Sequence, residues 1–348
     1  MNWEKRFDEL RENKRVVLYG AGKYGKIALE NIKKYLPQLE VLCFIDDNKL
    51  RNNGKIEDIA ILSLEEAVSL EKDFNILITN YYISSVLEKI ENYNFDMKHV
   101  FFWGELLIED VKDSFLIENA GNLWESYQCL SDCQSKLIFD CLVQARKTKN
   151  IDLLGRTCQQ RQYFPEDVFM LDSNEVFVDA GAFDGDTIEN FLKCTGNCFK
   201  FIYAFEPDKA NYEKLVGKDY GSNVITYNAG LYDKTAELCF LANKGGSSQI
   251  RKDGEDRIHA VKFDELNLPD KEVTFVKMDI EGSELQALKG MEKMIKRCRP
   301  KMAICIYHKF EDLWEIPLYI KKLVPEYKFY IRNYTTYLDE VVLYAVMR

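Results

Sequence analysis

One stretch decides the fold: Val176-Phe-Val-Asp-Ala-Gly-Ala-Phe-Asp-Gly-Asp186. Its first three residues are apolar, which predicts a short, buried parallel strand that ends at Asp179. Gly181 and Gly185 lie in the turn that follows, and a helical pattern begins at Thr187. A strand, a glycine-containing turn and a helix in this order predict the nucleoside-binding corner of a doubly wound α/β sheet. The glycines allow the backbone to approach a ligand closely.

The charge of this turn argues against a dinucleotide. A diphosphate site needs bare backbone amides and favours the pattern G-x-G-x-x-G. Here Asp179 precedes the turn, and Asp184 and Asp186 lie in it. These carboxylates would repel phosphates and attract a cationic ligand. S-adenosylmethionine fits, because its sulfonium and its amino group are both positively charged.

A second strand also points to a nucleoside. Residues 201–205 are apolar and aromatic, and Glu206 follows them 206 − 185 = 21 residues after Gly185. An acidic residue at about this interval binds the ribose hydroxyls in nucleotide-binding sheets. A structural turn would explain either feature alone, whereas the two in register favour a nucleoside site.

Length and composition describe a globular protein of two domains. The chain has 348 residues, of which 47% are hydrophobic and 30% charged, and its net charge is −10. This charge argues against broad binding to nucleic acid or to anionic membranes. The sequence contains no apolar run long enough to span a bilayer, and its charged N-terminus has no signal-peptide pattern. Ten cysteines without C-x-x-C pairs are expected to be reduced thiols in a cytoplasmic protein.

The N-terminal part predicts a second, smaller Rossmann-like unit over residues 14–103. A strand at 16–19 precedes a true G-x-G-x-x-G formed by Gly20, Gly22 and Gly25. The next strand ends in Asp46, 46 − 22 = 24 residues after Gly22, an interval that suits a ribose-binding acid. The remaining expected elements are helices at 26–35, 64–70 and 83–93, strands at 41–45, 76–79 and 100–103, and a short amphipathic helix at 3–13.

This stretch resembles the N-terminal sugar-nucleotide-binding domain of bacterial sugar acyltransferases. The resemblance rests on the strand, the Gly-Ala-Gly turn and the strand that ends in Ile-Asp-Asp. It implies a nucleotide or nucleotide-sugar ligand at the loop of Gly20, Gly22, Gly25 and Asp46. A docking or oligomerisation module that keeps the turn, for example in a homodimer, explains the pattern as well. No dehydrogenase set such as Tyr-x-x-x-Lys follows it, which argues against redox chemistry.

A helical connector is expected between the two units. Residues 105–165 are rich in helix formers at helical spacing and contain no Gly/Ser linker. They predict two or three helices that cover one edge of the C-terminal sheet. The candidates for ligand contact are Gln159, Arg161, Gln162 and Tyr163, although ordinary packing is the favoured interpretation. The predicted domains are therefore residues 1–104, 105–165 and 166–348.

The ends of the later strands supply further polar residues, and ligands bind at the carboxyl ends of strands in such sheets. Asn228 follows the strand at 224–227 and is expected either to meet an adenine or to stabilise a turn. Residues 236–241 and 246–250 predict an added β segment, with the glycine loop at 245–248 as a flap.

The strand at 273–278 ends in Asp279 and Glu281, which are expected at the reaction centre. Glu284 stands in the first turn of the following helix, where the helix dipole favours an acid. His308 follows the strand at 302–307 and is a candidate general base, with a capping histidine as the alternative. A terminal hairpin at 327–333 and 340–347 completes a seven-stranded sheet.

Four motifs in one order make residues 163–348 resemble the FkbM-type S-adenosylmethionine-dependent methyltransferases. They are Val-Phe-Val-Asp-Ala-Gly-Ala-Phe-Asp-Gly-Asp-Thr, Ala-Phe-Glu-Pro-Asp, Lys-Met-Asp-Ile-Glu-Gly-Ser-Glu and Ile-Tyr-His. The resemblance implies the class I methyltransferase fold, an α/β seven-stranded Rossmann-like sheet, and O-methylation of hydroxyls. The cofactor-binding positions are then Asp179, Gly181, Ala182, Phe183, Gly185, Glu206, Pro207, Asn228 and Asp279, with Glu281 and His308 as catalytic candidates.

The leading hypothesis is an O-methyltransferase that acts on a hydroxyl of a sugar, a glycan or a sugar nucleotide. The resemblance of the N-terminal unit to a sugar-nucleotide binder favours this acceptor. The alternatives are O-methylation of a small secondary metabolite and a non-catalytic scaffold that binds nucleotide-sugars. No metal is assigned, although a metal-assisted variant with Asp279 and Glu281 as Mg²⁺ ligands stays open.

Overall fold

The computed structural model describes residues 13–48, 54–70, 73–79, 83–103, 111–148, 152–155, 157–241, 249–250, 256–335 and 338–347. The chain divides into two compact units: residues 1–112 with 143–153, and residues 113–142 with 154–348. The helix expected at 3–13 and the glycine loop expected at 245–248 lie outside the described residues.

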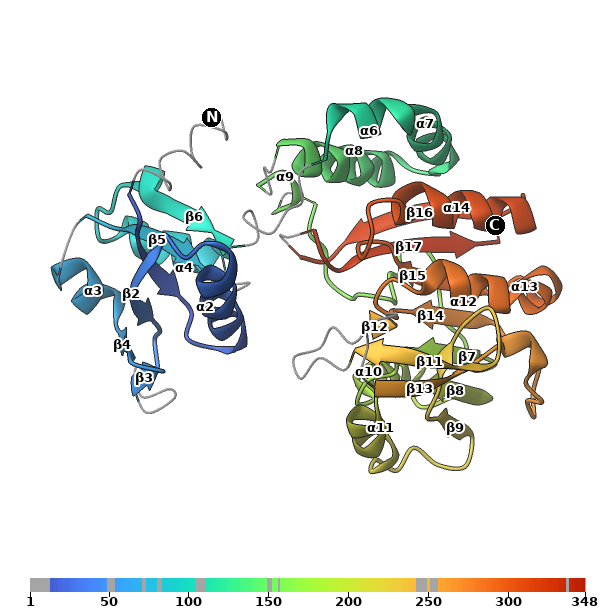
Figure 1. The fold of residues 1–348 in the computed structure, drawn as a ribbon. Helices are drawn as coiled ribbons and strands as arrows, with labels where there is room; N and C mark the ends of the chain where they lie inside the picture. The colour runs from blue at the N-terminus through green and yellow to red at the C-terminus, as the bar shows by residue number, and fades with distance from the viewer. Residues whose placement is uncertain are drawn as a thin grey trace. The chain divides into compact units, whose positions relative to one another are not determined.

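The N-terminal unit contains, among the described residues, a six-stranded sheet in the order β3-β4-β2-β1-β5-β6 (Figure 1). All neighbouring strands are parallel except the hairpin of β3 and β4, which is too short to give a sequence pattern and was not predicted. The strands are β1 (Arg15–Tyr19), β2 (Glu40–Ile45), β3 (Lys55–Ile56), β4 (Ile59–Leu62), β5 (Asn75–Ile78) and β6 (Val100–Phe102). The helices are α2 (Lys23–Tyr35), α3 (Leu64–Leu70) and α4 (Ile83–Glu91), and the 3-10 turn η2 (Met97–His99) precedes β6.

The C-terminal unit is built on a seven-stranded sheet in the order β16-β17-β15-β14-β7-β8-β9, within the part of the chain that the structure describes. Only β17 runs antiparallel to its neighbours, as the predicted hairpin requires. The predicted α/β fold with its seven-stranded Rossmann-like sheet is therefore confirmed. The strands are β7 (Val176–Ala180), β8 (Phe201–Phe205), β9 (Val224–Tyr227), β14 (Phe275–Met278), β15 (Lys301–Cys305), β16 (Lys328–Asn333) and β17 (Val341–Val346).

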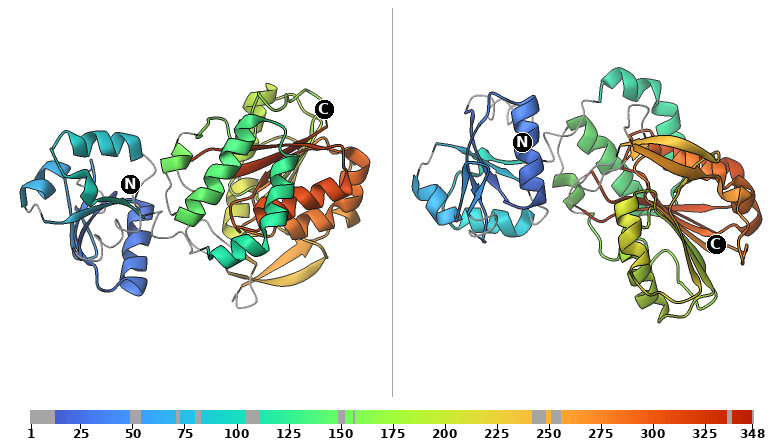
Figure 2. Two further views of the ribbon diagram at one scale, coloured as in Figure 1. Left: turned by 90° about the horizontal axis from the view of Figure 1, so that it is seen from above. Right: turned by 60° about the horizontal axis from the view of Figure 1, so that its bottom comes forward.

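Helices flank this sheet, as the three ribbon views show (Figures 1 and 2). The helical segment over residues 284–298 is divided into two helices, and Gly290 at the end of the first packs against the backbone of Tyr232, where a Cβ would lie 2.0 Å from the carbonyl oxygen. The last helix was not predicted, since Pro317 lies inside it and interrupts the helical signal. The helices are α10 (Asp186–Thr195), α11 (Lys209–Val216), α12 (Glu284–Gly290), α13 (Glu292–Cys298) and α14 (Asp312–Leu323).

A second sheet of four strands, counted over the described residues, is inserted between β9 and β14 in the order β10-β13-β11-β12. The predicted added β segment is present as β11 and β12. The last strand of this sheet along the chain ends at residue 261 and is followed by a 3-10 turn. The elements are β10 (Gly230–Leu231), β11 (Ala236–Leu241), β12 (Gln249–Ile250), β13 (Asp256–Val261) and η3 (Phe263–Glu265).

Helices that precede the sheet pack along its β16 edge. The Ser131 amide donates to the carbonyl of Phe329, and the Ser126 hydroxyl donates to the carbonyl of Leu313 in α14. The fully buried Arg332 of β16 is paired with Asp132, next to α8, and with Asp167. The helices of this segment are α6 (Asp113–Glu118), α7 (Ala120–Cys129), α8 (Cys133–Thr148) and α9 (Asp152–Gly155).

An aromatic stack fixes the central strands. The Phe177 ring of β7 stacks on Phe191 of α10 at a centroid distance of 4.6 Å and on Phe275 of β14 at 5.0 Å. All three side chains are fully buried. Stacked aromatic pairs contribute about 0.5–1.5 kcal/mol beyond the burial of their area. The stack therefore holds the start of the glycine turn against its neighbouring strand.

Replacing Phe177 with Ala is expected to lower the free energy of unfolding of the C-terminal unit by about 3–5 kcal/mol, because the substitution leaves a cavity between β7, α10 and β14. Urea unfolding followed by circular dichroism measures the loss. Phe183→Ala is the matched control: this ring is 43% exposed, so its removal should change stability little. Equal losses in the two variants would contradict the role given to the stack.

Candidate functional site

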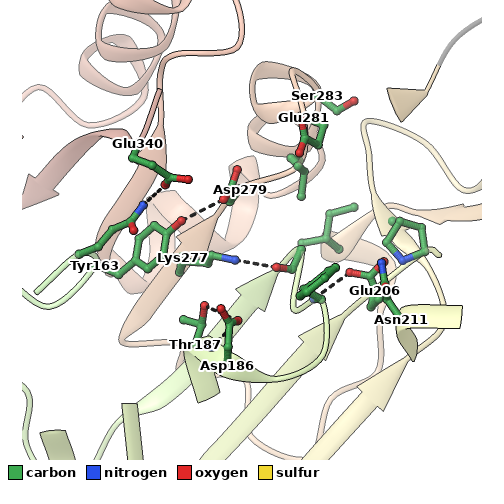
Figure 3. A pocket seen from close by; sticks show the side chains of 17 residues that line it. Tyr163, Asp186, Thr187, Glu206, Asn211, Lys277, Asp279, Glu281, Ser283 and Glu340 are labelled. Carbon is green, nitrogen blue, oxygen red and sulfur yellow. Dashed lines mark hydrogen bonds between the residues drawn. The ribbon is translucent and has the colours of Figure 1, made fainter. Parts of the chain in front are cut away.

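A cavity of about 290 Å³ lies at the carboxyl ends of β7, β8 and β14. Figure 3 shows Asp279, Glu281 and Glu340 on one side of it and Glu206 and Asn211 on the other. The full lining is Gln162, Tyr163, Gly181, Phe183, Asp186, Thr187, Glu206, Pro207, Asn211, Gly230, Leu231, Lys277, Asp279, Ile280, Glu281, Ser283 and Glu340. The cavity thus lies where ligands bind in open α/β sheets.

Two glycines shape the corner after β7. Gly181 has φ +79°, and a Cβ there would lie 1.9 Å from the carbonyl oxygen of Asp279, so that only glycine lets the two loops touch. Gly185 has φ +91° and precedes α10, and a Cβ there would lie 2.2 Å from the Tyr220 hydroxyl. The structure thus assigns these glycines to loop packing. Gly181 also lines the cavity, and Gly185 is not among the lining residues.

Glu206 bridges two loops from the end of β8. One carboxylate oxygen accepts the Phe183 amide and the other accepts the Asp208 amide, each at 2.8 Å. Burial raises the pKa of Glu206 to about 7, against the effect of these amide donors. Glu206 and its neighbour Pro207 line the cavity, and each carboxylate oxygen keeps a lone pair for a hydroxyl donor. Ribose binding by Glu206 stays a prediction.

A buried ion pair lies beneath the corner. The Lys277 ammonium of β14 is 3.1 Å from Asp179 Oδ1 and donates to the carbonyl of Gly181 at 2.6 Å. Burial raises the pKa of Asp179 to about 6 although Lys277 opposes this shift, so Asp179 is ionised at neutral pH. Burial opposes the charge of Lys277, but Asp179 and Asp279 outweigh it and raise the pKa of Lys277. Lys277 therefore presents a fixed positive charge to the loop.

The structure places Asp179 under the cavity. It is fully buried and is not among the lining residues. Asp179 therefore acts on the cavity indirectly, through its ion pair with Lys277, whose ammonium also binds the carbonyl of Gly181. The sequence reasoning missed Lys277, although a lysine in the apolar run Phe275-Val-Lys-Met278 is the signal that could have found it, because a charge in a central strand needs a partner.

Asp279 is held by hydroxyl groups from two sides. Its Oδ2 accepts the Tyr163 hydroxyl at 2.9 Å, and its Oδ1 accepts the Tyr307 hydroxyl at 3.3 Å. Burial opposes ionisation, but Lys277 and His308 outweigh it and hold the pKa of Asp279 below its ordinary value. Asp279 is therefore a fixed, ionised carboxylate in the cavity wall.

Glu281 follows in a strained turn and faces the cavity. Its φ is +55°, and that of Gly282 is +89°, so that two consecutive residues have left-handed backbone. Such strain in a non-glycine residue is typical of functional sites. Burial raises the pKa of Glu281 to about 7, and His308 counteracts part of this shift. Glu281 is thus a carboxylate that can gain or lose a proton near neutral pH.

His308 lies behind these two carboxylates. Its side chain is 6% exposed, and its Nε2 is 3.5 Å from Asp279 Oδ1 and 3.4 Å from Glu281 Oε2. Burial lowers the pKa of His308, but Glu284, Asp279 and Glu281 outweigh this effect and raise the pKa to about 9. His308 is not among the residues that line the cavity, whereas Glu281 is.

Glu284 lies in the first turn of α12, as predicted, and its burial shows that it also has a second role. Its side chain is fully buried, its Oε1 is 3.0 Å from His308 Nδ1, and it accepts the Ile280 amide at 3.0 Å. An acid in the first turn of a helix gains about 0.3–1 kcal/mol, whereas burying an ion costs several kcal/mol. The dipole alone cannot offset this cost, so His308 is the partner that keeps Glu284 inside.

Asn228 supports the chain rather than the cavity. Its amide nitrogen donates to the carbonyl oxygens of Glu206 and Pro207, and it is not among the lining residues. Of its two predicted roles, these bonds favour stabilisation of the turn. Ala182 is fully buried and also lies outside the lining.

Comparison with known families identifies the chemistry. Residues 179–336 match the model of the methyltransferase FkbM domain. The match spans 158 of the 348 residues (336 − 179 + 1 = 158), so it assigns this domain, and not the whole chain, to the FkbM methyltransferases. Members of this family use S-adenosylmethionine. Residues 12–101 match the model described as C2185-like, N-terminal, while the resemblance of this unit to sugar acyltransferases stays a prediction.

The fold is similar to that of a solved methyltransferase FkbM from Methylobacillus flagellatus KT, with a TM-score of 0.75, 22% identity, and coverage of 98% of this chain and 93% of that chain. For SMU.1697c from Streptococcus mutans, solved with S-adenosylhomocysteine, the TM-score is 0.32 and the identity 14%. The match covers 51% of this chain and 90% of that chain. For fibrillarin from Aeropyrum pernix, solved with S-adenosyl-L-methionine, the TM-score is 0.28 and the identity 13%. The match covers 51% of this chain and 69% of that chain. TM-scores this low carry no inference for this chain. A search of curated proteins found no match.

The glycine loop of the N-terminal unit is also explained by packing. A Cβ at Gly25 would lie 1.9 Å from the carbonyl oxygen of Gly20, and the Gly20 amide donates to Ile45. Asp46 accepts the Ala21 amide at 2.9 Å, so its carboxylate holds the loop itself. Gly22 caps α2 with extended backbone. Ligand binding by this loop stays a prediction.

Three groups of the FkbM domain have the spacing of a metal site. Ligand atoms of Asp279, Glu284 and His308 lie within 4.8 Å of one another. The prediction that no metal is bound stays a prediction. No helix in the described part of the chain is long and apolar enough to cross a membrane.

Lys277→Met is expected to destabilise the FkbM domain by about 3–5 kcal/mol, because Asp179 then becomes a buried charge without its cation. The double variant Asp179→Asn, Lys277→Met should be more stable than Lys277→Met alone, since the unpaired charge is removed. Urea unfolding of the wild type, both single variants and the double variant measures the coupling. A double variant that is less stable than Lys277→Met would contradict the pairing.

Proposed function

We propose that this protein transfers a methyl group from S-adenosylmethionine to a hydroxyl of a sugar, a glycan or a sugar nucleotide. The observation that carries the proposal is the composition of the cavity in the FkbM domain. Carboxylates from two separate segments meet on one side of it, Asp279 and Glu281 from the turn after β14 and Glu340 from just before β17, and Glu206 lies on the other. Such a lining suits a nucleoside that ends in a cationic amino acid.

The donor set fits the cofactor part by part. Glu206 would accept the ribose hydroxyls, while Pro207, Leu231 and Asn211 supply mixed apolar and polar surface for the adenine. Asp186 and Asp279 would bind the cationic amino-acid end. S-adenosylmethionine, when bound, supplies a methyl group activated by its sulfonium charge.

Glu281 is the best placed proton acceptor. It lines the cavity, whereas His308 lies behind it and faces Glu281 and Asp279 through Nε2. With a pKa of about 7, Glu281 can take the proton of an acceptor hydroxyl at neutral pH. The sequence pattern favours His308 as the general base, whereas the lining of the cavity favours Glu281. His308 would instead balance the charge of Glu281.

A polar acceptor is favoured at this end of the cavity. Ser283 and Glu340 lie beside Glu281 in the lining, and the Gln162 amide donates to Glu340. Hydroxyl and carboxylate groups in this arrangement can orient a polyol by hydrogen bonds. A small secondary metabolite with several hydroxyls would satisfy the same groups, and a non-catalytic scaffold would bind ligand without transfer.

Calorimetric titration tests the cofactor. Wild-type protein should bind S-adenosylmethionine and S-adenosylhomocysteine with micromolar affinity, and Glu206→Gln should weaken both, because the amide offers ribose hydroxyls one acceptor oxygen in place of two. Asp264→Asn is the control, since Asp264 accepts amides of α13 away from the lining. Binding of NAD in place of both ligands would overturn the proposal.

Glu281→Gln should lower methyl transfer at saturating cofactor by about 10²–10⁴-fold, because the amide cannot take a proton. In the wild type the rate should rise from pH 6 to pH 8, since the base works only when ionised and its pKa is about 7. A radiolabelled methyl-transfer assay over neutral glycosides, UDP-sugars and GDP-sugars measures both. An unchanged rate in Glu281→Gln would exclude Glu281 as the base.

A further inference from the structure

Glu284 is a buried charge that the proposed transfer does not use. It begins α12, and its carboxylate connects the turn after β14, which lines the cavity, with His308 after β15, which does not. Through one oxygen it contacts His308 Nδ1 at 3.0 Å and accepts the amide of Ile280 at 3.0 Å. Ile280 lies in the turn between Asp279 and Glu281, so the contact joins this turn to the end of β15.

The imidazole of His308 lies between Glu284 and two carboxylates that line the cavity. While Nδ1 faces Glu284, the opposite nitrogen of His308 faces Glu281 at 3.4 Å and Asp279 at 3.5 Å, and both of these carboxylates line the cavity. The side chain of His308 is almost fully buried, so its ring has little freedom to choose other partners. Carboxylates on both edges of an imidazole favour the form that carries hydrogen on both nitrogens.

We propose that Glu284 is a positioning residue of the transfer site: it fixes His308 through Nδ1, so that the Nε2 hydrogen faces the carboxylates of Glu281 and Asp279. This inference rests on the proposed function and deepens it. Glu284 touches neither the cavity nor an acceptor, and it acts through His308. The result is a row of alternating charges, from buried Glu284 through imidazolium to the proton acceptor Glu281.

The surroundings of His308 support a permanent positive charge on its ring. Besides Glu284, Asp279 and Glu281, two further acids act on it: Asp312 at the start of α14 and Glu340 before β17. On its own segment, the Tyr307 ring is 4.0 Å from the imidazole, and the ammonium of Lys309 is bound to the carbonyl of Gly282. Removing the Glu284 charge would withdraw the nearest of these acids.

The imidazolium has a consequence for the base. A positive charge beside Glu281 favours its ionised form and so lowers the pH at which it can accept a proton. Without Glu284 the ring would hold its own proton less tightly and would rotate more freely. The carboxylate of Glu281 would lose one of its fixed neighbours. Because the Glu284 charge also raises the pKa of Glu281 directly, the protonation of His308 is the readout that reports the role of Glu284.

The conservative variant Glu284→Gln separates this role from simple support of the turn. The amide oxygen of Gln can still accept the Ile280 amide, so the turn keeps its hydrogen bond, while the charge beside His308 is removed. Glu315→Gln is the matched control, because Glu315 is an exposed acid in the first turn of the neighbouring α14. The Glu315→Gln variant measures the effect of removing an acid from the first turn of a helix without changing the surroundings of His308.

The experiment is a pH titration of the imidazole signals of full-length protein labelled with ¹⁵N-histidine. The chain has three histidines, and His308→Asn assigns the relevant signal. In the wild type and in Glu315→Gln the midpoint for His308 should lie near pH 9. In Glu284→Gln it should fall by at least one pH unit, because the nearest carboxylate charge is removed.

A wild-type midpoint at or below pH 6.5 would overturn the inference, and this measurement needs no folded variant. An unshifted midpoint in Glu284→Gln would overturn it as well. Titration of the same samples with S-adenosylmethionine keeps the two proposals apart. Failure of the wild type to bind the cofactor would remove the proposed function, whereas normal cofactor binding with an unshifted His308 would remove only the role of Glu284.

Discussion

The site depends on the ion pair between Lys277 and Asp179 inside the sheet. Of the described residues that line the cavity, Lys277 is the only cation, and it faces acids both below and beside it. It neutralises Asp179, binds the carbonyl of Gly181 and lowers the pKa of Asp279. Because these contacts come from adjacent parallel strands, the charge of the cavity and the geometry of the glycine corner are fixed by one side chain.

The cavity as a whole still has an excess of negative charge. Burial keeps the pKa values of Glu206, Glu281 and Glu340 each at about 7, so these groups are partly protonated at neutral pH. A ligand with a sulfonium and an amino group would favour their ionised forms, which links cofactor binding to proton release. The same binding event would thus convert Glu281 into the form that accepts a proton. The excess of negative charge in the cavity would thus favour both binding of the cationic cofactor and ionisation of Glu281.

Much of this arrangement could be read from the sequence, because the carboxyl ends of parallel strands meet at one edge of a sheet. This rule placed Glu206, Asp279 and Glu281 together from their positions after apolar runs, and the structure brings all three into the lining. This rule does not identify Lys277, because its side chain lies within a strand; the lysine in an apolar run is a separate signal, and its partner is 98 positions away in the neighbouring strand (277 − 179 = 98). Nor could the rule reveal Glu340, which reaches the cavity because β17 inserts between β16 and β15. Whether His308 or Glu281 lines the cavity depends on how deeply each side chain is buried, and no sequence pattern indicates this.

The most direct test of the central claim, that this acidic glycine corner binds a sulfonium nucleoside, is a crystal structure of the protein with S-adenosylhomocysteine. The account predicts the ribose on the carboxylate of Glu206, the amino-acid end near Gly181 and Asp186, and the sulfur directed toward Asp279 and Glu281. Binding of the nucleoside outside this cavity, or a dinucleotide with its phosphates against Gly181 and Gly185, would contradict it.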